Sequence, residues 1–238
     1  MTWSILARDE AGRLGAAIAS RFFAVGALTV HARRGVGVLS SQALMNPLYG
    51  PQGLELLAAG RTPGQVIAML TGADTGRDQR QLHILPAQGR PAAWTGAACI
   101  EWCGHRIEED FCVAGNMLAG PRVVEATAQA FVQAQGQPLA QRLLAGLAAG
   151  EAAGGDKRGK QAAALRIQGD EDYPELDLRV DDHPEPVLEL QRLYRKSLER
   201  AQPFLACLAG RHDPVGVIDR AEIEARIERF QRERGGAA

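Results

Sequence analysis

Thr2, the residue directly after Met1, has the side chain whose type and position best suit a nucleophile. Methionine aminopeptidases remove the first methionine when a small residue such as threonine follows it. The mature chain would then begin with a threonine whose hydroxyl is the nucleophile and whose own α-amine, with an ordinary pKa near about 7.7–8.0, is the base. On position alone, however, a threonine that merely begins a strand is the more economical interpretation.

The segment AAGGDKRGKQ places Gly154, Gly155 and Gly159 around Asp156. A phosphate-binding P-loop needs Ser or Thr after its Gly-Lys pair and a strand before it, but here Gln161 follows the lysine and a helical pattern precedes the loop. The sequence therefore argues against nucleotide binding. It favours a loop whose backbone amides approach a ligand, with Asp156 and Gln161 near a cleft, and an ordinary helix-to-strand loop is the alternative.

Two further groups of residues suggest chemistry that we consider weaker. A zinc site could draw on three thiolates and an imidazole, from Cys99, Cys103, His105 and Cys112. Their spacing lacks paired C-x-x-C knuckles, and cysteine is also a common buried residue, so we expect no metal and no other cofactor. Asp182 and His183 lie between a strand and a helix that begins with proline, where Asp182 suits a helix cap. No G-x-S-x-G elbow accompanies them, which argues against a Ser-His-Asp triad.

The elements that must position these residues follow from hydrophobic periodicity and turn signals. Strands are predicted at residues 2–8, 14–19, 25–31, 35–41, 81–85, 91–94, 111–114, 161–167 and 176–180. Helices are predicted at about 51–60, 62–70, 121–135 and 139–149, and from 186 onwards. Hairpins followed by paired helices argue against a doubly wound parallel sheet. The prediction is an α+β fold, a four-layer α/β/β/α sandwich of two antiparallel sheets, over residues 1–202, with a helical tail at 203–238.

Composition narrows the classes of partner. Among 238 residues, 27 Lys and Arg balance 28 Asp and Glu, and no stretch gathers basic side chains, so we expect no nucleic-acid partner. No window is long and apolar enough to span a membrane, and MTWSILARDE lacks the features of a secretory signal. Four cysteines suit reduced thiols. The expectation is a cytoplasmic protein with no membrane partner.

Several segments together resemble one known family. They are MTWSILARD, ASRFFAVGAL, SSQALMNPLYGPQGLELLAAG, TGAACIEWCGH, GNMLAGPRVVEA, AAGGDKRGKQAAAL and DLRVDDHPEPVLELQRLY. They are similar to segments of the uncharacterised family called domain of unknown function 1028, of the N-terminal nucleophile (Ntn) hydrolase superfamily, over residues 1 to 195. The resemblance implies the four-layer Ntn sandwich and, by analogy, cleavage of an amide bond, but it implies no substrate.

Under this resemblance, Thr2 attacks an amide carbonyl and supporting groups come from the ends of neighbouring strands. The candidates are Ser20, Arg21, Ser41, Gln42, Asn46 and Asn116, together with Asp156, Gln161, Asp182 and His183. An arginine there suits a substrate carboxylate, and Asn116 suits an oxyanion.

We therefore expect an amidohydrolase that cleaves a small amide or amino-acid derivative through Thr2. The alternative is a non-catalytic ligand-binding or assembly protein that keeps the Ntn fold. The tail carries Ile223 and Ile227 among alternating charges, a pattern typical of a solvated helix or a dimer contact, and we expect a homodimer.

Overall fold

The structure is a computed structural model that describes residues 2–235. Its contacts divide the chain into two compact units, one ending at Leu190 and the other beginning at Gln191. Within the described residues, no helix is both long enough and apolar enough to cross a membrane.

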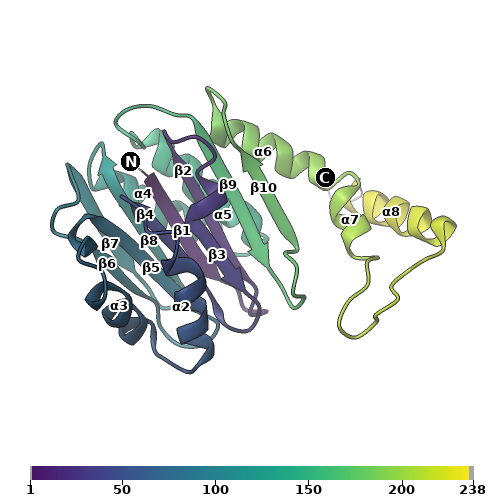
Figure 1. Ribbon diagram of the computed structural model, residues 1–238. Helices are drawn as coiled ribbons and strands as arrows, with labels where there is room; N and C mark the ends of the chain where they lie inside the picture. The colour runs from purple at the N-terminus through teal and green to yellow at the C-terminus, as the bar shows by residue number, and fades with distance from the viewer. Residues whose placement is uncertain (1, 236–238) are drawn as a thin grey trace. The chain divides into compact units, whose positions relative to one another are not determined.

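The first unit contains two antiparallel sheets (Figure 1). The larger has the strand order β10-β9-β2-β1-β8-β7, with bounds β1 Thr2–Arg8, β2 Leu14–Ser20, β7 Trp102–Ile107, β8 Phe111–Leu118, β9 Ala162–Gln168 and β10 Leu176–Val180. The smaller has the order β3-β4-β5-β6, with bounds β3 Val30–Arg33, β4 Gly37–Ala43, β5 Arg80–Pro86 and β6 Ala92–Thr95.

Helices cover the outer face of each sheet. The pair α2 (Tyr49–Ala58) and α3 (Pro63–Gly72) packs on the four-stranded sheet, and α4 (Arg122–Gln133) and α5 (Leu139–Ala152) pack on the six-stranded sheet. Strands β1 and β8 contact β4 and β5, so the two sheets face each other. The predicted α+β sandwich with α/β/β/α layers is confirmed.

Strand β1 has both faces buried, and its side chains alternate between two environments. Trp3 points toward α5, where a side chain on Gly150 would collide with its indole, and Ser4 points toward the smaller sheet, where it contacts Gln42. Thr2 and Leu6 share the face of Ser4. The face between the sheets therefore changes along β1 from polar at Thr2 to apolar at Leu6, which packs with Val38 and Leu85.

Local signals explain where some elements begin. Helix α3 begins with a capping box, because Thr62 Oγ1 accepts from the Gln65 amide and the Gln65 side chain accepts from the Thr62 amide. The strand predicted at 25–31 is wrong over residues 26–29, where the short helix α1 (Gly26–Thr29) lies instead, and only its last two residues belong to β3. Thr29 Oγ1 donates to the Val25 carbonyl and so stabilises that single turn.

The second unit contains the end of α6 (Pro186–Ser197), α7 (Ala201–Leu205) and α8 (Arg220–Gly235).

Strand β7 of the first unit was not predicted from the sequence. It is an edge strand whose residues are partly buried or exposed, so it shows no clear alternation.

Candidate functional site

Thr2 lines a cavity of about 320 Å³ at the end of the two sheets. Thr2 is 6% exposed, and its Oγ1 donates a hydrogen bond of 3.1 Å to Ser20 Oγ. It stands opposite Ser20 on β2 and opposite Asn116 on β8. Gln42 and Asn116 line the same cavity. Two larger depressions, of about 530 and 660 Å³, hold none of the candidate residues.

Most of the remaining cavity wall is apolar. It is built by Phe22, Val25, Ala43, Leu44, Met45, Ala98, Ile100 and Met117, with Thr29, Gln79, Cys99 and Arg158 as the other polar members. Arg158 is the one charged side chain among these described residues. Most of these lining residues could not be predicted from the sequence. They lie in loops that follow strands, where no periodic pattern indicates which way a side chain points.

Backbone strain is concentrated at this cavity. Ala43 and Met117 line it and have left-handed φ values of 67° and 52°. Ala24 and Glu101, with φ values of 51° and 58°, are the neighbours of two further lining residues. These four are all of the non-glycine residues with such φ values in the described part of the chain. Each such conformation costs about 1–3 kcal/mol and is typical of functional sites.

A buried hydrogen-bond network fixes the orientation of Asn116. Gln81 Nε2 donates to the Gly115 carbonyl at 2.8 Å, so Gln81 Oε1 is the acceptor for Gln42 Nε2 at 2.7 Å and for Asn116 Nδ2 at 3.0 Å. Asn116 Nδ2 must therefore face Gln81, and Oδ1 must face away from it. Asn116 is 1% exposed and its Oδ1 has no hydrogen-bond partner among the described residues. It is an acceptor without a donor at the cavity wall.

The same network continues away from the cavity to His83. Ser4 Oγ donates to Gln42 Oε1 at 2.7 Å, so it accepts from His83 Nε2 at 2.8 Å. His83 Nδ1 is then the acceptor for the Cys112 thiol at 3.3 Å. Burial lowers the pKa of His83 to about 3 and raises the pKa of Cys112. Because Ser4 and His83 are fully buried and are not among the residues that line the Thr2 cavity, we interpret this Ser–His contact as structural.

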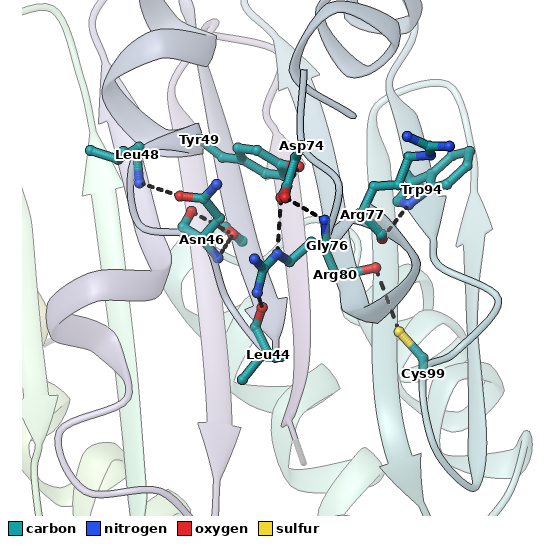
Figure 2. A network of polar contacts seen from close by, with 11 residues as sticks. Leu44, Asn46, Leu48, Tyr49, Asp74, Gly76, Arg77, Arg80, Trp94 and Cys99 are labelled. Carbon is teal, nitrogen blue, oxygen red and sulfur yellow. Dashed lines mark hydrogen bonds and ion pairs between the residues drawn. The ribbon is translucent and has the colours of Figure 1, made fainter. Parts of the chain in front are cut away.

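A second hydrogen-bond network supports two residues that line the cavity, Leu44 and Cys99 (Figure 2). Arg80 Nη1 donates to the Leu44 carbonyl, and its Nε donates to Asp74 at 3.0 Å. Tyr49 also donates to Asp74, at 2.8 Å. Hydrogen bonds from Arg80 and Tyr49 hold the pKa of Asp74 far below its ordinary value, and burial raises the pKa of Tyr49. Cys99 Sγ contacts the Arg80 carbonyl at 3.5 Å, so both Leu44 and Cys99 depend on this one arginine.

Asp156 anchors the glycine-rich loop. Its carboxylate accepts from the backbone amides of Arg21 at 2.7 Å and Arg158 at 2.9 Å, and it pairs with the Arg158 guanidinium at 3.2 Å. Asp156 is therefore close to the cavity but acts through Arg158, which lines it. The Arg21 guanidinium donates to the Arg158 carbonyl instead of entering the cavity.

The other candidate residues lie elsewhere. Arg21, Gln161, Asp182 and His183 line a separate depression of about 280 Å³. Gln161 Nε2 donates to Asp182 at 3.1 Å, and His183 Nδ1 accepts from the Glu185 amide at the start of α6. Ser41 and Asn46 form a turn, in which Ser41 Oγ bonds both main-chain groups of Asn46.

The cysteines and histidine considered for zinc do not converge. Cys112 contacts His83 between the sheets, and His105 Nδ1 pairs with Thr95 Oγ1. Cys103 Sγ contacts the Cys99 carbonyl. Across residues 2–235, no three His, Cys, Asp or Glu side chains are grouped to hold a metal ion.

Comparisons with known proteins place the chain in a family. The model of the family of unknown function DUF1028 matches residues 2–190. A crystal structure of a protein matching that family, from Silicibacter pomeroyi, is 32% identical with a TM-score of 0.85, and the match covers 92% of this chain and 96% of that one.

A more distant match is the Anbu (ancestral beta-subunit) protein from Yersinia bercovieri, 14% identical with a TM-score of 0.45, covering 82% of this chain and 94% of that one. A likeness this remote supports no conclusion about this chain. No curated protein matches the sequence. The family match spans nearly all of the first unit and agrees with the structural match from Silicibacter pomeroyi, and this chain belongs to the family of unknown function DUF1028.

Proposed function

We propose that the protein is an N-terminal nucleophile amidohydrolase in which Thr2, freed by removal of Met1, attacks the carbonyl of a small amide. The observation that carries the proposal is the place of Thr2, at the first position of a buried central strand with its side chain on a cavity. Met1 lies outside the described residues, so its removal is part of the proposal. A small-molecule substrate, a homodimer and a cytoplasmic location belong to the same proposal.

The proposed reaction needs only groups that one residue carries. The Thr2 hydroxyl gives its proton to the α-amine as Oγ1 bonds to the amide carbon, and the resulting ammonium then protonates the leaving nitrogen. The acyl group stays on Oγ1 as an ester. Water, deprotonated by the same amine, attacks that ester and releases a carboxylic acid and the free hydroxyl.

Asn116 is suited to orient the amine. It stands opposite Thr2 in the sheet, and its Oδ1 is a buried acceptor that lacks a donor. A hydrogen bond from the α-amine to this oxygen would satisfy it and would fix the direction of the amine lone pair. Its Nδ2 retains a second hydrogen, beyond the one given to Gln81, that suits a developing oxyanion.

Mass spectrometry tests the proposal in two steps. The intact mass of the purified protein should correspond to a chain without Met1, and a retained Met1 would block the amine and exclude the mechanism. Exposure to a panel of amides and hydroxyl-directed acylating probes should then give an adduct on Thr2. Thr2→Ser should keep the adduct because it keeps the hydroxyl, and Thr2→Ala should lose it.

The alternative function is ligand binding without catalysis. The hydrogen bond from Thr2 to Ser20 favours it, because it gives the hydroxyl a structural role. This alternative predicts that no adduct forms on Thr2 and that Thr2→Ala leaves ligand affinity unchanged.

A further inference from the structure

We propose that the ligand of the Thr2 cavity is an amide that also carries a carboxylate, with Arg158 binding the carboxylate. The proposed ligands are N-acylated single amino acids with apolar side chains. Cleavage of the amide rests on the proposed function, whereas recognition of the carboxylate does not.

The charge of the cavity wall supports an anionic ligand. Arg158 is the one charged group among the described lining residues, and the rest are neutral. Asp156 pairs with one side of this guanidinium, and an anion at its other side would replace the hydration that a cation loses beside an apolar wall.

The geometry around Arg158 leaves donors for a ligand. Asp156 holds the guanidinium through Nε at 3.4 Å and Nη2 at 3.2 Å, and Nη1 has no partner among the described residues. The Asp156 side chain is 1% exposed and also accepts two backbone amides, so it is fixed, whereas the Arg158 side chain is 43% exposed. A guanidinium held on one side in this way presents its other donors in the planar fork that matches a carboxylate.

The apolar wall and the volume define the rest of the ligand. Phe22, Leu44 and Ile100 line the cavity although each is at least half exposed, so a bound apolar group would cover them. The volume of about 320 Å³ is at the lower end of the range of about 300–1,000 Å³ for small-molecule pockets. It suits one amino-acid side chain with an acyl group and is small for an extended peptide.

Calorimetric titration tests the proposal with matched pairs of probes. The Thr2→Ala protein is titrated with N-acetyl-L-valine, N-acetyl-L-leucine and N-acetyl-L-phenylalanine, and with the neutral primary carboxamide of each. At least one acid should bind about tenfold or more tightly than its carboxamide. Arg158→Gln should erase that preference, and Arg158→Lys should restore part of it because it returns the charge without the fork.

Lys157→Gln is the matched control, since it removes the same charge from the neighbouring residue of the loop, whose side chain is 62% exposed and pairs with Glu101. It should keep the preference. Equal binding of acids and carboxamides, binding unaffected by Arg158→Gln, or no binding of any of the six compounds would overturn the proposal.

Hydrolysis by the unaltered protein separates this proposal from the proposed function. If the acids bind selectively but no probe is cleaved, the carboxylate site stands and the amidohydrolase proposal fails. If acids and carboxamides are cleaved at equal rates and bind alike, the amidohydrolase proposal stands and the role of Arg158 fails.

Discussion

His83 is held where its imidazole cannot easily take up a proton. Both ring nitrogens are engaged, Nε2 as the donor to Ser4 and Nδ1 as the acceptor from Cys112. Protonation would convert Nδ1 into a donor that faces a thiol and would leave a charge between two sheets. Burial, followed by repulsion from His105, therefore lowers the pKa of His83 to about 3.

This depressed pKa makes stability depend on pH. Below the ordinary value of 6.5 the unfolded chain binds a proton at this position and the folded chain does not, so the free energy of unfolding falls as the pH falls toward 3. His83 alone should lower the free energy of unfolding by about 2 kcal/mol when the pH falls from about 7 to about 5. Urea denaturation at both pH values measures this loss. His83→Gln should reduce the pH dependence by that amount, and an unchanged dependence would contradict the assignment.

Some site residues could be predicted from the sequence and others could not. Thr2 and Asn116 are polar residues at adjoining strand ends of the larger sheet, so their place on one cavity follows from the strand pattern. Gln42 lies on β4 of the smaller sheet and reaches the same cavity only because the two sheets face each other. The choice between Arg21 and Arg158 does not follow from it. That choice depends on Asp156, which binds the Arg21 backbone and the Arg158 side chain, and this contact joins residues 135 positions apart.

At the scale of elements, the ion pair between Asp74 and Arg80 joins the loop after α3 to the start of β5 (Figure 2). Arg80 also donates to the carbonyl of Leu44, which lines the cavity. The helix could be predicted, because Thr62 and Pro63 form a local start signal. The link could not, since the loop that carries Asp74 has no periodicity. Strand β7 escaped prediction for a similar reason, as its partly buried residues follow neither of the two regular periods.

Asp74→Asn should destabilise the protein at neutral pH by about 1–3 kcal/mol, because Arg80 loses its charged partner while the carboxylate and guanidinium are both largely buried. The pKa of Asp74 is depressed in the folded state, so its contribution is present above the unfolded value of about 3.9 and is lost as the pH falls further. The difference between the two proteins in urea denaturation should therefore shrink in acid.

Asp78→Asn is the control for this substitution, since Asp78 is exposed in the neighbouring 3₁₀ helix, Arg77–Gln79. It should change the free energy of unfolding by less than about 0.5 kcal/mol. Equal effects of the two substitutions would show that the ion pair between Asp74 and Arg80 contributes nothing specific to the stability of the protein.

At the scale of the first unit, the contact between the sheets has two parts. The part around Leu6 is apolar and could be predicted from the alternation of the strands. The part nearer Thr2 is polar, with Ser4, Gln42 and Gln81 all fully or nearly fully buried. From sequence alone these polar residues favour an exposed face, and only the pairing of the two sheets, which gives each of them a partner, allows them to be buried.

Gln81 is the residue on which this polar part depends. It lies on β5, is fully buried, and bonds to Gln42 on β4, Thr95 on β6 and Asn116 on β8. Gln81→Met keeps the approximate shape but leaves the Asn116 and Gln42 amides and the Gly115 carbonyl without this partner. An unsatisfied buried group costs about 1–3 kcal/mol, so the loss should be at least about 3 kcal/mol.

Urea denaturation of the Gln81→Met protein should show a lower midpoint with an unchanged slope, because the same surface is exposed on unfolding. Gln133→Met, on the exposed side of α4, makes the same chemical change and should stay within about 0.5 kcal/mol of the unaltered protein. If the two substitutions had equal effects, the polar residues would not be what joins the sheets beside Thr2. Asn116 would then have no fixed orientation, and its unsatisfied Oδ1 would no longer indicate that a hydrogen-bond donor belongs beside it in the cavity.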